Sequence, residues 1–292
     1  MKLRLVALAS FMLPAAIVSA QNERVTVRLA PSPNQTIHLR TAQDMEMTTE
    51  MNPTAGGASS VPTSMKMHAV IDTTSAIGPT DHDGHYSATM TIDTISATLT
   101  MNGREMPLPA QATDAAKQAI TFSYDENGKV VDVSAGDSPS AEMNTAKQIL
   151  MQAFATVAPM TLSVGESVTV PTALNLPMPS GGPPVPMGVA AETRYTLTAV
   201  TFDGADRIAH LTSHTTSRLN QAPPSVPAGP PLAFELTTTS DGKSDVNVDR
   251  GIILHAEQHS TIEGTVHGGA TDRAVANMTM HGTVTMVSDL VR

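Results

Sequence analysis

Cysteine and tryptophan are absent from the 292-residue chain, and aromatic residues make up only 3% of it. Without cysteine the protein has neither disulfides nor a thiol nucleophile, so its stability has to come from a hydrophobic core. Because aromatic residues are scarce, the 18 methionines, with valine, isoleucine and threonine, are expected to fill the strand positions that aromatic residues often take.

Long hydrophobic runs are absent after the first 20 residues. Lys2 and Arg4 precede an apolar stretch from Leu5 to Val18, and the small residues Ser19 and Ala20 then lead into a polar segment. This order is typical of a secretory signal peptide. It predicts a signal peptide over residues 1–20, a mature chain over 21–292, and export to a periplasm or to the cell exterior. Since no later stretch could form a transmembrane helix, we do not expect an integral membrane protein.

Positive charge is also scarce, because the formal net charge is −10. Loss of the signal peptide would remove Lys2 and Arg4 and bring it to −12. Such an acidic protein repels phosphate backbones and anionic lipid surfaces. We therefore expect no nucleic-acid partner.

Most of the mature sequence alternates with a period of two, which predicts β-strands. Met45 and Met47 share one face of a predicted strand, and Met65 and Met67 share one face of the next. The breaker-rich segment between them predicts a long hairpin whose methionine faces lie together. A third Met-x-Met pair occurs near the end of the chain, at Met278 and Met280. These six methionines are candidates for lining an apolar cleft.

Local signals refine this pattern. The apolar parity shifts within 86–101, which predicts a β-bulge near Asp93-Thr94. Asn102-Gly103 predicts a tight turn. The clearest hairpin has 119–124 and 129–134 as its two strands. The proline- and glycine-rich stretch 175–188 predicts a loop or a polyproline-like excursion, and the proline-rich stretch 221–231 predicts a second loop.

One segment, 139–157, has helical periodicity. Ser138 suits the N-cap and Pro139 the first helical position, and Pro159 follows its end. The fold class predicted is mainly β, a long curved antiparallel sheet resembling a half-barrel, with this one amphipathic helix; a β-sandwich is the alternative. The mature chain could comprise two similar halves, 21–136 and 160–292, joined by the helix.

The order of elements resembles that of uncharacterised families of exported bacterial β-rich proteins. The segments that carry the resemblance are Tyr124 to Val130, the Leu-x-Val-Gly-Glu-Ser step from Leu162 to Ser167, and Asp249 to Ile253. Their general layout is similar to the half-barrel lipoprotein carriers of the bacterial envelope. The chain departs from the pattern at Val168, where an aromatic residue is common. The resemblance implies an envelope location and an apolar-ligand cleft, and it implies no activity.

Histidine and acidic residues supply the candidate metal ligands. On a strand, His255, Glu257 and His259 point to one side, and such side chains bind zinc or copper. His210 and His214 share a face in the same way. The run from Asp81 to His85 could hold a cation at a loop tip, but a polar hairpin turn is the favoured interpretation. For both histidine groups a solvent-facing polar strip is favoured.

No enzyme signature is present: the chain has no nucleophile elbow, P-loop, dinucleotide-binding glycine motif or zinc-protease motif. We therefore expect neither an enzyme nor a bound cofactor. Three functions stay open, namely binding of a lipid or other apolar molecule in the methionine-lined cleft, a structural or protein-interaction role in the cell envelope, and copper or zinc handling through methionine and histidine.

Overall fold

A computed structural model describes residues 24–28, 30–53, 62–106, 119–126, 129–135, 159–178, 185–221, 232–268 and 276–291. The predicted signal peptide, 1–20, and the predicted helix, 139–157, lie outside these residues. The described residues form the strands β1 (Val25–Val27), β2 (Thr36–Pro53), β3 (Thr63–Ile77), β4 (Tyr86–Met101), β5 (Arg104–Met106), β6 (Ile120–Tyr124), β7 (Val130–Ala135), β8 (Met160–Leu162), β9 (Ser167–Met178), β10 (Val185–Asp203), β11 (Asp206–Gln221), β12 (Leu232–Asn247), β13 (Ile252–Gly268) and β14 (Ala276–Val291).

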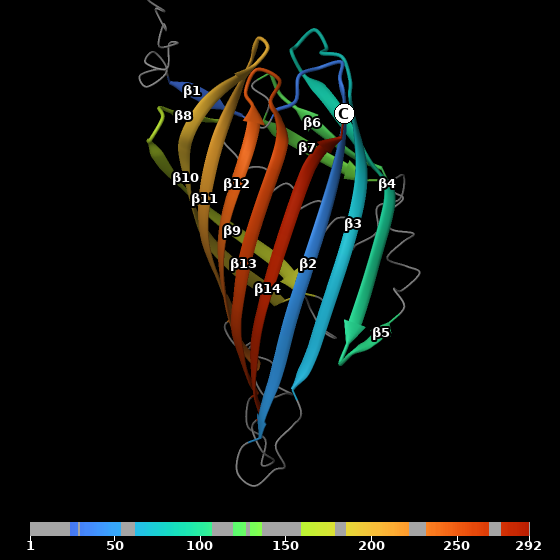
Figure 1. Cartoon of the computed structure of the whole chain (residues 1–292), viewed down its shortest axis with the longest axis vertical. Coiled ribbons are helices and arrows are strands. Elements are labelled where there is room, and N and C mark those ends of the chain that lie inside the picture. The colour runs from blue at the N-terminus through green and yellow to red at the C-terminus, as the bar shows by residue number, and fades with distance from the viewer. Residues whose placement is uncertain are drawn as a thin grey trace, which may run out of the picture.

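Twelve strands form one antiparallel sheet, while β1 and β8 pair separately. The strand order is β7-β6-β4-β3-β2-β14-β13-β12-β11-β10-β9, with β5 paired to β4. The long strands curve, and the sheet curls toward the short strands behind it (Figure 1). The predicted long, curved antiparallel sheet is therefore confirmed, and the described residues do not form the alternative β-sandwich.

The sheet joins sequence-distant strands at its centre. Strands β9 to β14 pair each with the next, as do β2 to β4. The two series meet where β14 lies beside β2, in register from Ala276 opposite Pro53 to Val291 opposite His38. The division into two similar halves stays a prediction.

Several turn and bulge predictions are confirmed. On β3 and β4, Thr73 is opposite Ile92 and Asp72 is opposite Thr94, so Asp93 is the extra residue of a β-bulge. Asn102 and Gly103 have φ of 49° and 77°, as a tight turn with two left-handed residues requires. The hairpin predicted over 119–134 is formed by β6 and β7.

The prediction of a loop over 175–188 is wrong at both ends of that range, where the chain forms strands instead. Strand β9 continues to Met178 and β10 begins at Val185, with Pro177 opposite Pro186. Proline is tolerated in a strand where its missing N–H is not needed for the ladder. That condition holds because β9 is an edge strand of the described sheet and Pro186 precedes the stretch of β10 that pairs with β11.

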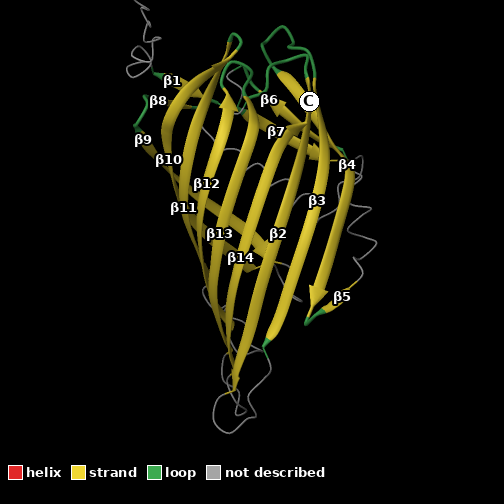
Figure 2. Cartoon of the chain, in the orientation of Figure 1, coloured by secondary structure: helices red, strands yellow, loops and turns green. Residues whose placement is uncertain are grey.

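The hydrophobic core lies at one end of the long strands. One cluster joins β1 and β8 to β10, β11 and β12 and includes Val25, Leu162, Leu197 and Val246. The other joins β6 and β7 to β2, β3, β4 and β13, with Phe122 and Val133 buried in it. Figure 2 shows these short strands gathered at one end of the sheet, beside several of the loops that connect its strands.

The two faces of the large sheet are defined by this core. Leu197 and Val246 point to the side on which β1 and β8 pack, which we call the inner face. Leu39 packs against the other core cluster, with β6 and β7, on this same face. Because successive side chains of a strand alternate, the register pairs extend this assignment along every long strand. The opposite side is called the outer face.

Candidate functional site

The methionines of β2 and β3 form one block on the inner face. Met45 is opposite Met67 and Met47 is opposite Met65, with no shift of register between these strands. Leu39, on the same side of β2, packs against the core. The predicted hairpin with its methionine faces together is therefore confirmed.

The neighbouring strands extend this block. On β4, Met101 is opposite Met65 and Leu99 is opposite Met67. On β14, Val284 is opposite Met45, whereas Met280 and Met278 lie nearer the far end of β2, opposite Thr49 and Met51. Thus four of the six predicted cleft methionines form one block and the other two lie beside it on the same face. These six methionines are half-buried, and the neighbouring Met101 is 39% exposed.

The other half of the inner face carries hydroxyl groups. Thr193 and Thr215 share a hydrogen bond of 2.9 Å across β10 and β11, and Ser240 and Ser260 share one of 2.7 Å across β12 and β13. In the same register row, Thr215 lies opposite Ser240 and Ser260 opposite Val284. One row of side chains therefore changes from hydroxyl to apolar as it crosses the sheet.

No charged residue occupies an inner-facing position of the six central strands, β12, β13, β14, β2, β3 and β4, within their described residues. Their charged residues point outward or, for Asp93, lie at the bulge. Period-two alternation produces this separation, because charged residues of these strands keep one parity along each strand. The inner face is consequently a neutral surface, part apolar and part hydroxyl-bearing.

The outer face carries the charged residues of these strands, and several of them belong to cross-strand pairs of histidine and aspartate. In four pairs the histidine Nδ1 lies 2.6–2.8 Å from an aspartate Oδ1 on the adjacent strand. These pairs are His68–Asp44, His210–Asp245, His214–Asp241 and His255–Asp289. Hydrogen-bonded side-chain pairs on facing strands stabilise a sheet modestly, so these pairs have a structural use without any ligand.

The predicted metal-ligand group lies on the outer face. The Nδ1 atom of His255 contacts Asp289, and its Nε2 atom lies 3.4 Å from Glu257 Oε1. The hydrogen bond with Asp289 is the main reason that the pKa of His255 is raised. His259 Nδ1 contacts the Thr285 hydroxyl at 3.2 Å instead. Among the residues that the structure describes, no three histidine, aspartate or glutamate side chains are grouped to hold a metal ion. Zinc or copper binding by this group stays a prediction.

Two shallow depressions, which sequence reasoning missed, lie on the outer face. One of about 530 Å³ is lined by charged residues including Asp241, Lys243 and Glu257. A second, of about 300 Å³, is lined partly by Asp44 and Lys66 and shares Thr285 with the first. The sequence had singled out Glu257 and His259, which line the first depression. Only the register of β11 to β14 with β2 and β3 brings the remaining residues beside them, so no local sequence signal could have found the depressions as a whole.

The Asp81 to His85 segment forms the polar turn that the sequence favours. The Asp81 carboxylate accepts backbone N–H bonds from Asp83 and His85 at 2.9 and 2.8 Å, and Gly84 has φ of 83°. The N–H bond from His85 is the main cause of a lowered pKa for Asp81. These contacts use the carboxylate to close the turn.

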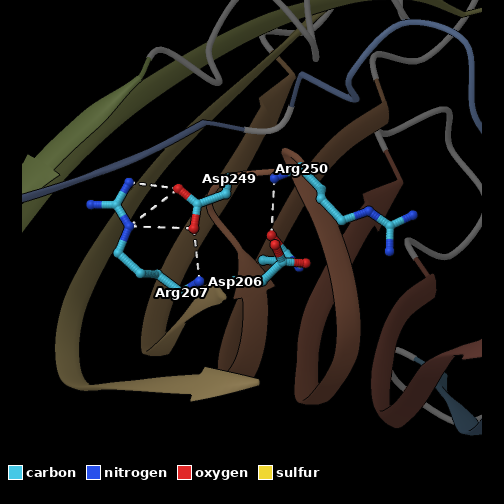
Figure 3. Close-up of polar contacts among 5 residues, drawn as sticks. Asp206, Arg207, Asp249 and Arg250 are labelled. Carbon is cyan, nitrogen blue, oxygen red and sulfur yellow. Dashed lines mark hydrogen bonds and ion pairs between the residues drawn. The ribbon is translucent and has the colours of Figure 1, made fainter. Parts of the chain in front are cut away.

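A polar cluster fixes the turns at the core end of the sheet (Figure 3). The Arg207 backbone N–H and its Nη2 donate to Asp249 at 2.7 and 2.6 Å, and these side-chain and backbone hydrogen bonds lower the pKa of Asp249. Asn247 donates to Asp206 at 2.8 Å and accepts from the Arg250 N–H at 2.9 Å. The cluster ties the start of β11 to the turn between β12 and β13, which is a structural role.

Comparison with known proteins adds little to this geometry. No protein-family model matches the chain, and no curated protein sequence matches it. Among solved structures, an outer membrane channel from Pseudomonas putida F1 aligns over 90% of this chain and 98% of its own, at 9% sequence identity and a TM-score of 0.19. At that TM-score the likeness carries no argument about this protein. Within the described residues, no helix is long and apolar enough to span a membrane.

Proposed function

We propose that this protein is an exported, non-catalytic binding protein that holds an uncharged lipid or other apolar molecule against its inner face. The observation that carries the proposal is the absence of charge from the described inner-facing positions of six adjacent strands, next to the methionine block. A charged side chain facing an apolar ligand would lose its hydration, so a neutral face suits such a ligand.

Methionine suits a site for a chain-like molecule. Its side chain is unbranched and polarizable, and it adapts to apolar partners of irregular shape. The neighbouring hydroxyl rows around Ser240 and Thr215 could donate hydrogen bonds to ester or hydroxyl oxygens of the same ligand. The ligand class supported best is therefore a neutral amphiphile. Its hydrocarbon chain would lie on the adjacent strands β14, β2, β3 and β4, and its polar end would lie toward β10, β11, β12 and β13.

Export is supported by the sequence of residues 1–20, and the acidic charge supports a partner other than nucleic acid. The first test of the proposal is native mass spectrometry of the mature protein, purified from its exported fraction. Bound mass in the range of a lipid is the expected result. A bare polypeptide mass would turn the search toward protein partners in the envelope.

A pair of adjacent substitutions tests the face directly, with the dye Nile red as an apolar probe. Met47 points inward and Thr48 points outward on the same strand. We expect Met47→Lys to weaken Nile red binding roughly tenfold, because a lysine would be desolvated by the probe. Thr48→Lys, which adds the same charge on the outer face, should leave binding unchanged. Equal loss in both variants, or in neither, would contradict the proposal, provided that circular dichroism shows both are folded.

One contact supports a second candidate function, ester hydrolysis. The Thr201 hydroxyl lies 2.8 Å from His210 Nε2, and His210 Nδ1 lies 2.6 Å from Asp245. This is the order of hydroxyl, imidazole and carboxylate in nucleophilic catalysis. It ranks second because Thr201 is exposed and lines neither of the two depressions described above. Hydrolysis of p-nitrophenyl acetate that is lost in Thr201→Val would promote it over the binding function.

A further inference from the structure

Five methionines from three adjacent strands occupy neighbouring positions on the inner face. Met47, Met65 and Met101 lie in one register row across β2, β3 and β4. Met45 and Met67 form the next inner-facing row on β2 and β3. We call these five residues the methionine cluster. Their side chains are half-buried to exposed, so solvent reaches this part of the inner face and can carry a small ion to it.

The spacing of a β-sheet brings such side chains within reach of one another. Adjacent strands lie about 4.8 Å apart, and residues two apart on one strand lie about 6.6 Å apart on the same face. Methionine has three rotatable side-chain bonds before its terminal methyl, so sulfur atoms at these spacings can turn toward a common point. Three thioethers in one row therefore offer a three-sulfur ligand set without any movement of the backbone.

The chemistry of the cluster selects the ion. Thioether sulfur is a soft, neutral ligand that favours Cu(I), whereas Zn(II) and Cu(II) favour imidazole, thiolate or carboxylate groups. The chain contains no cysteine, and no histidine, aspartate or glutamate occupies a described inner-facing position of β14, β2, β3 or β4. A monovalent ion also places less uncompensated charge on a neutral face than a divalent ion does.

We propose that the methionine cluster binds one Cu(I) ion, with Met47, Met65 and Met101 as its principal ligands and Met45 and Met67 as neighbours that can replace one of them. Thioethers carry no proton at neutral pH, so binding releases none and is nearly independent of pH between about 5 and 8. The site differs from the predicted zinc or copper group of His255, Glu257 and His259, which lies on the opposite face.

The test uses the full mature protein and Cu(I) held by the chelator bicinchoninate under anaerobic, reducing conditions. We expect the wild-type protein to remove one equivalent of Cu(I) from the chelator, at similar affinity at pH 5.5 and pH 7.5. The triple variant Met47→Leu/Met65→Leu/Met101→Leu should lose at least tenfold in Cu(I) affinity. Leucine has nearly the volume of methionine and no sulfur, so the apolar surface is retained.

A second triple variant is the matched control. Met278→Leu/Met280→Leu/Met286→Leu changes three inner-facing methionines of β14 outside the cluster and should keep wild-type Cu(I) affinity. No Cu(I) uptake by the wild-type protein, or equal uptake by the two variants, would overturn the proposal. Nile red binding separates this result from the proposed function, because leucine keeps the apolar face and should keep the probe in both variants. If the cluster variant does not fold, the single change Met65→Leu gives the same comparison.

Discussion

Gly251 lies where two parts of the chain touch at the core end of the sheet. It has φ of 67°, and a Cβ atom there would overlap the backbone carbonyl of Ala30, the connection between β1 and β2. Ser32 donates its backbone N–H to the Arg250 carbonyl next to this contact, at 3.0 Å. The glycine therefore serves both the turn conformation and the close approach of two backbones.

We expect Gly251→Ala to lower the free energy of unfolding by about 3 kcal/mol, combining left-handed strain with overpacking. Gly204 is the matched control, because it has φ of 63° but nothing within 4 Å of its Cβ position. Gly204→Ala should cost only about 1 kcal/mol, from the strain alone. Urea denaturation measures both values, and equal costs would show that the contact with Ala30 is unimportant.

His255 gives the outer face a pH-dependent contribution. The hydrogen bond with Asp289 raises the pKa of His255 above its ordinary value of 6.5. A raised pKa in the folded state means that the stabilisation is fully present below about pH 6.5 and is lost as pH rises through the folded value. The side chain is 35% exposed, so solvent screens the interaction and its contribution is small.

We therefore expect His255→Gln to destabilise the protein by about 0.5 kcal/mol more at pH 5.5 than at pH 8.5. Thermal or urea unfolding at the two pH values measures the difference. Asp289→Asn removes the main partner of His255. In a protein that carries Asp289→Asn, the difference between the effects of His255→Gln at the two pH values should therefore be smaller. If this pH difference is unchanged in the Asp289→Asn protein, the neighbouring Glu257 would be the dominant partner of His255 instead.

At the scale of elements, the Arg207–Asp249 contact joins the start of β11 to the turn between β12 and β13. Because hydrogen bonds from Arg207 lower the pKa of Asp249, the stabilisation is present above about pH 4 and is lost as pH falls through the folded value. Asp249→Asn should cost about 1 kcal/mol at pH 7, and the difference from wild type should fade in acid.

The measurement is urea unfolding at pH 7 and at about pH 3. Glu50→Gln removes a carboxylate from an exposed outer-face position and serves as the control, with an expected change within about 0.5 kcal/mol. A cost for Asp249→Asn that does not diminish in acid would mean that the turn needs the charge-independent geometry of aspartate.

The period-two alternation of apolar residues predicted features of single strands correctly where the signal lay within a few residues. The parity shift between Ile92 and Ile95 predicted the bulge at Asp93, because one extra residue moves the apolar side chains to the other parity. Composition was misleading at Pro177 and Pro186, where the backbone continues as paired strands. Proline is compatible with a paired strand where its missing N–H is not needed for the ladder, as on the edge strand β9 and in the part of β10 that precedes its pairing with β11.

At the scale of the whole molecule, the described hydrophobic core and the proposed binding surface occupy different parts of the sheet. The buried clusters lie at the end with the short strands, whereas the methionine cluster extends along β2, β3 and β4 away from it. This separation allows the binding surface to stay accessible while the other end holds the fold. A stable end can then support an apolar face that a ligand, rather than the core, covers.

We expect Leu197→Ala to lower the free energy of unfolding by about 3 kcal/mol, because Leu197 is 0% exposed within the core. Leu99→Ala, a change of the same size beside the methionine cluster, should cost about 1 kcal/mol or less, since that side chain is only half-buried. Urea denaturation of both variants provides the comparison. Similar costs would mean that the inner face around Leu99 is packed as part of the core.

Sequence alternation alone was enough to predict that most of the chain forms strands, and that Met45 and Met47, like Met65 and Met67, share one face. The bulge near Asp93 and the polar turn at Asp81 were also predictable, since each follows from alternation or from contacts within a few residues. The pairing of β14 with β2, the place of Met101 in the methionine row and the contact between His210 and Asp245 could be seen only in the folded chain. Strand pairing over long sequence separations is set by the core and the connections of the whole sheet, and alternation within one strand carries no record of which strand lies beside it.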